Sequence, residues 1–179
     1  MLIGIAGKKQ VGKNTVASML QYLFASKEHR EFIILPIAFM LKNATADILH
    51  CKKERLEDEW FKELPISWLN NITVREFLQK LGTEVGRTID KDLWINAYLR
   101  KIDPNADIIV PDIRFQNEAN KIKEYKPGNI IIKVVKDTEL KDNHISETSS
   151  DTIEGDYIIH NNKSFSDLYR RVSDIYYKL

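Results

Sequence analysis

A loop rich in glycine and lysine joins two apolar segments near the start of the chain, and it constrains the fold more than any other feature. The loop, Gly7-Lys-Lys-Gln-Val-Gly12-Lys13, has the G-x-x-x-x-G-K spacing of a phosphate-binding loop. Its glycines allow successive backbone N–H groups to point inward, and the helix that follows directs the positive end of its dipole at the same point. The junction predicts that Gly7, Gly12 and Lys13 hold the phosphates of a nucleotide.

The residue after the loop lysine departs from the commonest form of this motif. A Ser or Thr that binds Mg²⁺ usually stands there, whereas this chain has Asn14 followed by Thr15. Kinases of the adenylate kinase type also carry their threonine one place later, so the departure favours a kinase of small molecules.

Apolar, β-branched runs alternate with helical patterns along the chain. Continuous apolar runs indicate strands that are buried on both faces. Strands that alternate with helices pair in parallel through right-handed crossovers. The sequence therefore predicts an α/β fold, a three-layer α/β/α sandwich around a parallel five-stranded sheet. The expected strands are Leu2–Ala6, Phe32–Ile37, Ile108–Val110, Ile130–Val135 and Tyr157–Ile159.

Three helices are expected from apolar residues at helical spacing. The second begins at Thr73, because Thr73-Val-Arg-Glu76 is a capping-box pattern. The last follows an N-cap at Ser164. Their apolar stripes are Val16, Met19, Leu20 and Leu23; Val74, Phe77, Leu78, Leu81 and Val85; and Phe165, Leu168, Val172, Ile175 and Leu179.

Composition limits the class of function. The 179 residues suit one domain, and 27 Lys and Arg against 26 Asp and Glu leave a formal net charge of +1. This balance argues against nucleic-acid binding. A single cysteine, Cys51, allows no internal disulfide and fits a reducing cytoplasm. The sequence shows neither a membrane span nor a signal peptide, so we expect a cytoplasmic protein with small-molecule partners and no membrane or nucleic-acid partner.

A second group of charged residues follows the expected strand at 108–110. Ligands of open α/β sheets bind outside the carboxyl ends of the strands, so Asp112 and Arg114 should face the cleft that holds Lys13. Asp112 suits Mg²⁺ or a substrate group, and Arg114 suits a phosphate. The alternative is a helix cap with a surface ion pair. Glu118, four residues after Arg114, could simply pair with it.

Two stretches lie outside the alternation of strands and helices. Residues 51–72 carry Trp60 and Trp68, which we interpret as core residues more readily than as stacking partners of a base. Residues 137–155 are polar and suit a lid-like loop; His144 and Glu147 belong to that lid or form a solvated pair. Gly82 and Gly86 lie within the expected second helix, where they indicate either close approach of a ligand or a C-cap followed by a solvated Arg87.

These segments together resemble the deoxynucleoside monophosphate kinases of tailed bacteriophages, a branch of the P-loop, adenylate-kinase-like superfamily. The resemblance follows the family's order along nearly the whole chain. Leu-Gly-Thr, Pro-Asp-x-Arg and His-x-x-Glu are its most specific parts. The matching segments are GKKQVGKNT, AFMLK at 38–42, VREFLQKLGTEVGR at 74–87, Trp94, IVPDIRFQNEA at 109–119, HISE at 144–147 and DYIIHNNKSFSDL at 156–168.

The resemblance implies a P-loop NTPase fold of the nucleoside monophosphate kinase type and transfer of a phosphoryl group from ATP, with Mg²⁺, to a deoxynucleoside 5′-monophosphate. It implies one kinase domain over residues 1–179, with a substrate-binding helical excursion at 43–105, and relatives of this type are often homodimers. Lys13, Asp112 and Arg114 would be catalytic, and Gly12, Lys13, Asn14 and Thr15 would hold the ATP phosphates. Thr15 and Asp112 would hold the metal. The segment 161–164, with Asn162, would contact the ATP base, or it is only a turn with a helix cap. The substrate side would comprise Lys9, Lys42, Arg75, Gly82, Thr83, Arg87, Trp94, Asp112, Arg114 and Glu118.

Two rival functions stay open. Another P-loop metabolite kinase, similar to dephospho-coenzyme A kinase, would have a comparable last strand and helix. A nucleotide-dependent switch or DNA-associated ATPase is the rival from another class. Against a GTPase, the segment Asn162-Lys163-Ser164-Phe165 lacks the aspartate that reads guanine.

Overall fold

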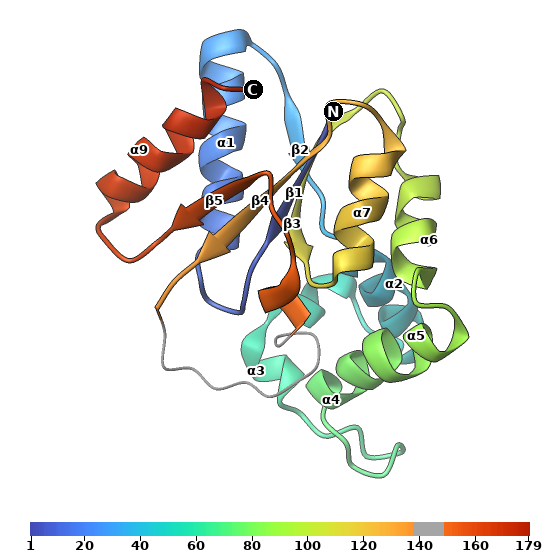
Figure 1. Cartoon of the computed structure of the whole chain (residues 1–179). Coiled ribbons are helices and arrows are strands. Elements are labelled where there is room, and N and C mark those ends of the chain that lie inside the picture. Colours follow the sequence, from blue (N-terminus) through green and yellow to red (C-terminus); the bar gives the residue numbers. More distant parts are fainter. Residues whose placement is uncertain (138–148) are drawn as a thin grey trace. The chain divides into compact units, whose positions relative to one another are not determined.

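The computed structural model describes residues 1–137 and 149–179, which form two compact units. The first unit comprises Met1–Pro36 and Ile102–Leu179, and the second comprises Ile37–Lys101. The second unit begins and ends slightly earlier than the excursion expected at 43–105. Figure 1 shows the course of the chain through both units.

A parallel five-stranded sheet forms the centre of the first unit, as the alternating pattern predicts. The strand order is β2-β3-β1-β4-β5, and every neighbouring pair is parallel. The central strand β1 therefore has β3 on one side and β4 on the other. The strands are β1 (Leu2–Ala6), β2 (Phe32–Ile34), β3 (Asp107–Ile113), β4 (Ile130–Val135) and β5 (Tyr157–His160).

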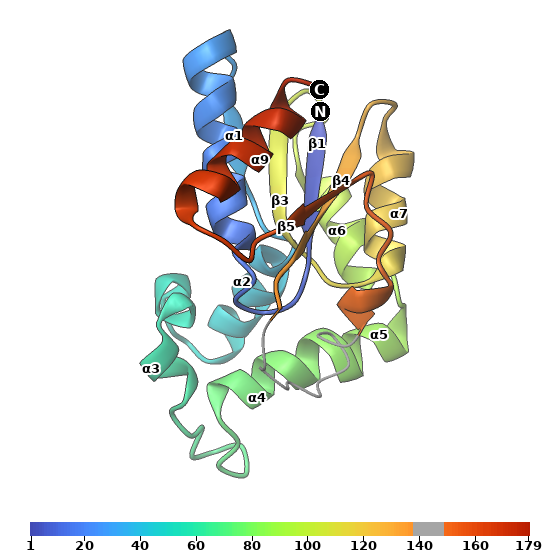
Figure 2. The ribbon, with the colours of Figure 1, turned by 60° about the vertical axis from the view of Figure 1, so that its left-hand side comes forward.

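Helices cover both faces of this sheet. Figure 2 shows α1 (Lys13–Glu28) and α9 (Phe165–Tyr176) on one side of the strands and α7 (Gln116–Tyr125) on the other. The larger core lies under α1 and α9, where the expected stripe residues of α1 and Leu168, Val172 and Ile175 of α9 are buried against strand residues. The three-layer α/β/α fold is thus confirmed. In the described residues, no helix is both long and apolar enough to cross a bilayer.

The second unit consists of short helices and turns. Its own apolar cluster centres on Ala46, Leu56, Ile66 and Val74. Its elements are α2 (Ala38–Ile48), a 3₁₀ segment (Lys53–Glu57), α3 (Glu59–Lys62), α4 (Val74–Gln79), a π-helical segment (Lys80–Val85), α5 (Gly86–Ile89) and α6 (Leu93–Lys101). The capping box expected at Thr73 is present: Glu76 N donates to Thr73 Oγ1, and Thr73 N donates to Glu76 Oε2.

Several expected boundaries and core positions are wrong. β2 ends at Ile34 rather than Ile37, because Pro36 has no N–H to extend the ladder and Ile37 already has helical backbone angles as the N-cap of α2. Val85, expected in the apolar stripe, is 50% exposed, because the π-helical segment alters the 3.6-residue repeat before it. Phe165 is also exposed, since it lies in the first turn of α9 directly after the N-cap Ser164.

The strand end opposite the phosphate-binding loop is held by an ion pair between Arg30 and Asp107. Arg30 Nε donates to Asp107 Oδ2 at 2.5 Å and Arg30 Nη2 donates to Oδ1 at 2.8 Å. The Arg30 guanidinium also lies over the rings of Phe24 and Phe32. The hydrogen bond from Arg30, aided by the N-terminal amino group, lowers the pKa of Asp107.

We expect Asp107→Asn to destabilise the protein by about 1 kcal/mol at pH 7, since partly screened charged hydrogen bonds are lost. The folded-state pKa of Asp107 lies below its unfolded value, so its contribution is complete at neutral pH and is lost as the pH falls through the folded-state pKa. Urea unfolding should therefore show a difference in the free energy of unfolding between wild type and variant that is smaller at acidic pH than at pH 7. Glu31→Gln, an exposed neighbour, is the control; a difference independent of pH would contradict this account.

Candidate active site

The phosphate-binding loop lies between β1 and α1, where the sequence places it. Three loop residues have positive φ angles: Gly7 (144°), Gln10 (63°) and Gly12 (100°). A Cβ atom at Gly7 would lie 2.4 Å from the carbonyl oxygen of Val134, so the loop crosses the end of β4 too closely for any side chain. Both motif glycines are therefore required by the backbone path.

Lys13 is folded back over the loop that it closes. Its Nζ donates to the carbonyl oxygens of Gly7 at 2.7 Å and Lys8 at 2.5 Å. These bonds hold the ammonium group within the concavity of the loop, where a phosphate would bind. Lys9, Asn14 and Thr15 are exposed on the loop and the first turn of α1.

Asn161 anchors the loop, a role that the sequence did not indicate. Its Nδ2 donates to the carbonyl oxygen of Val11 at 2.9 Å, and a Cβ at Gly12 would lie 2.6 Å from that same nitrogen. The neighbouring Asn162, expected at the ATP base, bonds Asp137: Asp137 N donates to Asn162 Oδ1, and Asn162 Nδ2 donates to Asp137 Oδ2, both at 2.8 Å. Two consecutive asparagines directly after β5 are the only indication of this anchor in the sequence, and the sequence does not show which of the two contacts the loop.

The tip of β3 lies beside the loop, as expected for Asp112 and Arg114. β1 and β3 pair in parallel, and Ala6, the last residue of β1, pairs with Ile113. The register shifts between Gly4 and Ala6, so that Pro111 and Asp112 together oppose one residue of β1. Such bulges are common beside active sites, and proline fits one because it has no N–H to donate.

Glu118 fixes the turn that carries Arg114. Its Oε2 accepts hydrogen bonds from the backbone N–H groups of Arg114 at 2.9 Å and Phe115 at 3.1 Å, and the residue is 8% exposed. These bonds satisfy backbone donors ahead of α7, which suits a carboxylate at a helix N-terminus. These contacts make Glu118 a support for the turn that carries Arg114, whereas the family resemblance implied a place on the substrate side.

Oxygen ligands suited to Mg²⁺ lie at this same end of the first unit. Thr15 offers an exposed hydroxyl in the first turn of α1, and Asp112 is a half-buried carboxylate at the tip of β3. The described residues contain no cluster of three metal-ligating His, Cys, Asp or Glu side chains. This donor set fits Mg²⁺ held by one or two protein oxygens together with phosphates and water, rather than by an all-protein cage.

Two of the three expected substrate-side cations of the second unit, Lys42 and Arg75, are ion-paired. Lys42 Nζ lies 2.6 Å from each oxygen of Glu57. Arg75 Nε donates to Glu63 Oε1 and Arg75 Nη2 donates to Glu59 Oε2, both at 2.6 Å. Hydrogen bonds from Lys62 and Arg75 lower the pKa of Glu59 to about 2, so this carboxylate is charged at any physiological pH.

The two glycines of the second unit make room for side chains of other helices. A Cβ at Gly82 would lie 2.7 Å from Leu41 Cδ2, and one at Gly86 would lie 2.4 Å from Trp94 Nε1. Trp94 Nε1 also donates to the carbonyl oxygen of Gly82 at 2.8 Å. The C-cap interpretation of Gly86 is wrong because the helix continues to Ile89.

The remaining expected residues of this unit lie on the same helical stretch. Thr83 is half-buried in the π-helical segment, and Arg87 Nη1 donates to the carbonyl oxygen of Lys91 at 3.1 Å. The expectation that Trp60 and Trp68 are core residues is wrong: they are 67% and 64% exposed, because they belong to a short helix and a turn at the surface. His144 and Glu147 lie outside the described residues, as does most of the expected lid.

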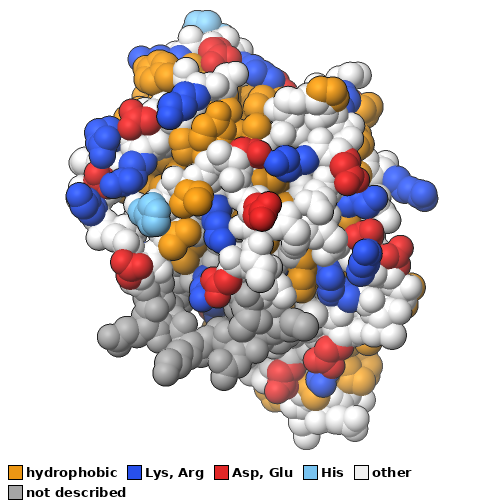
Figure 3. Space-filling model, viewed as in Figure 1, with side chains coloured by type: hydrophobic (Ala, Val, Ile, Leu, Met, Phe, Trp, Pro, Cys, Tyr) orange, Lys and Arg blue, Asp and Glu red, His pale blue; other side chains and the backbone are white. Residues whose placement is uncertain are grey.

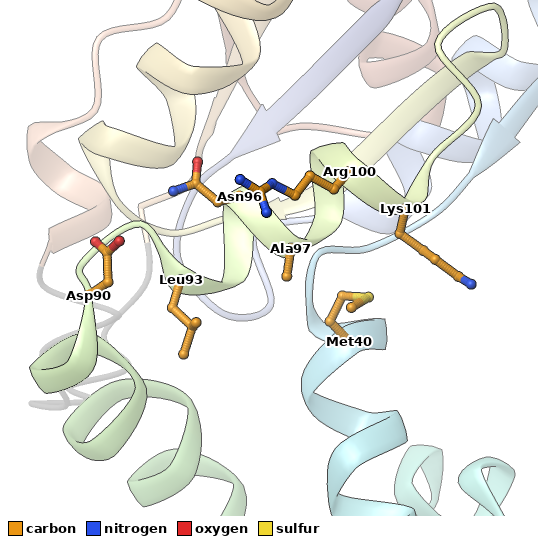
Figure 4. Close-up of a pocket in the computed structure, with 7 residues that line it drawn as sticks. All are labelled: Met40, Asp90, Leu93, Asn96, Ala97, Arg100 and Lys101. Atoms are coloured by element: carbon orange, nitrogen blue, oxygen red, sulfur yellow. The ribbon is translucent and has the colours of Figure 1, made fainter.

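A shallow cavity of about 490 Å³ lies on the second unit, along α6 and the start of α2 (Figure 4). Figure 4 shows Asp90 at one end and Lys101 at the other, with Met40 facing α6. None of the expected substrate residues lines it; the lining comprises Met40, Asp90, Leu93, Asn96, Ala97, Arg100 and Lys101.

The sheet order, the strand-to-helix phosphate loop and the charged tip of the adjacent strand define a P-loop kinase fold. Shikimate kinase from Aquifex aeolicus has this fold too: it is 12% identical, with a TM-score of 0.50 over 99% of this chain and 95% of the other. A model of the deoxynucleotide monophosphate kinase family matches residues 38–172, more than half of the chain. The chain belongs to the deoxynucleotide monophosphate kinase family and is a phosphotransferase.

Viral proteins that bear this family name are similar to the chain. One from Acanthamoeba polyphaga mimivirus is 28% identical over 96% of this chain and 94% of its own length. The deoxynucleotide monophosphate kinases of Enterobacteria phage T4 and Escherichia phage RB69 are 26% and 31% identical over 77% and 60% of this chain. The chain spans about half the length of these two phage enzymes, 53% and 48%.

We expect Gly12→Ala to impair nucleotide binding far more than stability. The new methyl group would collide with the Asn161 amide that anchors the loop. The left-handed backbone conformation at residue 12 would destabilise an alanine there by only about 1–2 kcal/mol. Gly128→Ala is a matched control, because Gly128 also has a positive φ (83°) but has no atom within 4 Å of the added Cβ. Thermal unfolding should show similar losses for both variants, and only Gly12→Ala should raise the KM for ATP. Equal KM values would contradict this role of Gly12.

Proposed function

We propose that this chain transfers the γ-phosphoryl group of ATP, with Mg²⁺, to the 5′-phosphate of a deoxynucleoside monophosphate and so forms the diphosphate. The observation that carries the proposal is the parallel pairing of β1 with β3, which brings the phosphate-binding loop and the Asp112–Arg114 tip to one sheet edge. Family membership supports this acceptor class, since the related viral proteins bear its name.

Charge and position are the main contributions required of the protein. An oxygen of the acceptor phosphate attacks in line, so no side chain needs to act as a nucleophile. Lys13 and the loop N–H groups bind the β- and γ-phosphates of ATP, and Arg114 neutralises charge on the transferring group. Thr15 and Asp112 would hold Mg²⁺, which neutralises phosphate charge when bound. Lys42 and Arg75 bind the acceptor phosphate.

Two further expectations accompany this function. We propose that the enzyme works in the cytoplasm, that of the host if a phage encodes it, where ATP and deoxynucleotides are present. We also propose a homodimer, which the frequency of dimers among similar enzymes supports. Light scattering across a range of protein concentrations tests the second expectation.

Substrate choice can be tested with a panel of acceptors. We expect coupled ADP-release assays with ATP and Mg²⁺ to show rapid turnover with at least one deoxynucleoside monophosphate and none with dephospho-coenzyme A. Turnover only with dephospho-coenzyme A would favour the metabolite kinase alternative. ATP hydrolysis stimulated by DNA, but by no monophosphate, would favour the ATPase.

Lys13→Ala should lower kcat/KM by roughly 10²- to 10³-fold, the usual effect of removing one group that stabilises transition-state charge. The fold should persist, because Lys13 is partly exposed on a loop rim and its bonds are to loop carbonyl oxygens. Lys27→Ala, in the last turn of the same helix, is the control with unchanged activity. Circular dichroism and the ADP-release assay measure the two effects; full activity of the Lys13 variant would refute its role.

A further inference from the structure

One short acidic segment supplies ion-pair partners for Lys42 and Arg75, the two cations to which the proposed function assigns the acceptor phosphate. Lys42 lies on α2 and Arg75 lies on α4, yet both form ion pairs with residues 57–63. Glu57 pairs with Lys42, and Glu59 and Glu63 pair with Arg75. The segment therefore neutralises, in the same unit, the two cations to which we assign the acceptor phosphate.

The glutamates occupy the part of Arg75 that a phosphate would use. Parallel N–H groups of a guanidinium form a two-bond fork with a phosphate. In Arg75 the Nε and Nη2 groups, which form one such edge, each donate at 2.6 Å to a different carboxylate. An acceptor phosphate that takes this edge must displace Glu59 and Glu63. At Lys42 it must compete with Glu57, both of whose oxygens lie 2.6 Å from the ammonium nitrogen.

The backbone holds α3 next to α4 without help from these ion pairs. Ile66 N donates to the Ile72 carbonyl at 2.8 Å, and Val74 N donates to the Leu64 carbonyl at 3.0 Å. Asp58 caps α3 by accepting a hydrogen bond from Trp60 N at 2.8 Å. The two ends that carry Glu63 and Arg75 are thus joined by main-chain bonds, and replacement of the glutamates should leave the segment folded.

Solvent exposure makes these ion pairs exchangeable. The side chains of Glu59 and Glu63 are 69% and 60% exposed, whereas that of Arg75 is 28% exposed. Exposed ion pairs contribute little to stability, so a carboxylate can leave at small cost. A phosphate monoester carries about −1.5 to −2 charges at neutral pH, against one on a carboxylate. It can therefore replace the glutamates, while their charges still lower its affinity.

We propose that Glu57, Glu59 and Glu63 are affinity-setting competitors of the acceptor phosphate, which keep Lys42 and Arg75 neutralised until a complete substrate arrives. Small anions such as sulfate bring no nucleoside contacts to offset the displacement, so the empty site excludes them. This inference rests on the proposed function, because it takes Lys42 and Arg75 as acceptor-binding groups.

The test is the double variant Glu59→Gln, Glu63→Gln, which removes the two negative charges and keeps the size of the side chains. Two like charges within several ångströms of the phosphate are removed, so the acceptor KM should fall by about 3- to 10-fold. Inhibition by sulfate should strengthen by a similar factor. The KM for ATP should change by less than about twofold, because the ion pairs of these two glutamates are with Lys62 and Arg75 of the second unit. Glu57→Gln should act in the same direction through Lys42.

Glu54→Gln is the matched control, since it removes one charge from the first turn of the 3₁₀ segment that leads into residues 57–63. It should leave the acceptor KM unchanged. An acceptor KM that is unchanged or higher in the double variant would overturn the inference and show that the glutamates orient Arg75 instead. If wild type phosphorylates no monophosphate, the proposed function fails separately. Calorimetric titration of sulfate into both proteins then still decides whether the glutamates mask Arg75, because tighter binding by the variant supports masking and equal binding refutes it.

Discussion

Parallel pairing of β1 with β3 is the constraint on which the functional site depends. Residues more than 100 positions apart meet because Ala6 and Ile113 are paired at the same edge of the sheet. One of these strands leads into the phosphate loop, and the other carries Asp112 and leads to Arg114. Without this pairing, the loop and the residues at 112 and 114 would not meet at one edge of the sheet.

Much of this arrangement can be predicted from the sequence, because the sequence patterns that produce it are compatible with few other structures. A G-x-x-x-x-G-K loop between an apolar run and a helical pattern requires glycine at positions of positive φ, and the structure has both glycines there. The buried strands can be predicted equally well, since their apolar runs are continuous. Family membership then agrees with the resemblance carried by the segments after the loop.

Other parts were not predictable, since they depend on tertiary contacts. The π-helical segment shows no distinct local signal, yet it exposes Val85 and places Gly82 against Leu41. The loop anchor Asn161 and its neighbour Asn162 have identical side chains, and only the structure shows which one reaches Val11. Trp60 and Trp68 were expected inside because tryptophan is largely apolar, but short helices and turns have too little buried area to cover them.

A net charge near zero does not show which cations are ion-paired, because it only sums the charges of the side chains. Basic and acidic side chains are interspersed on the face shown in Figure 3. Arg30 and Arg75 each pair with carboxylates at short distance, but their surroundings differ. The partner of Arg30 is 19% exposed and its guanidinium lies over two rings, so exchange of that pair would uncover apolar surface. Arg75 faces carboxylates that are mostly in water, and these can give way to another anion. The same chemical pair is therefore structural in one unit and exchangeable in the other, and exposure of the acidic partner decides which.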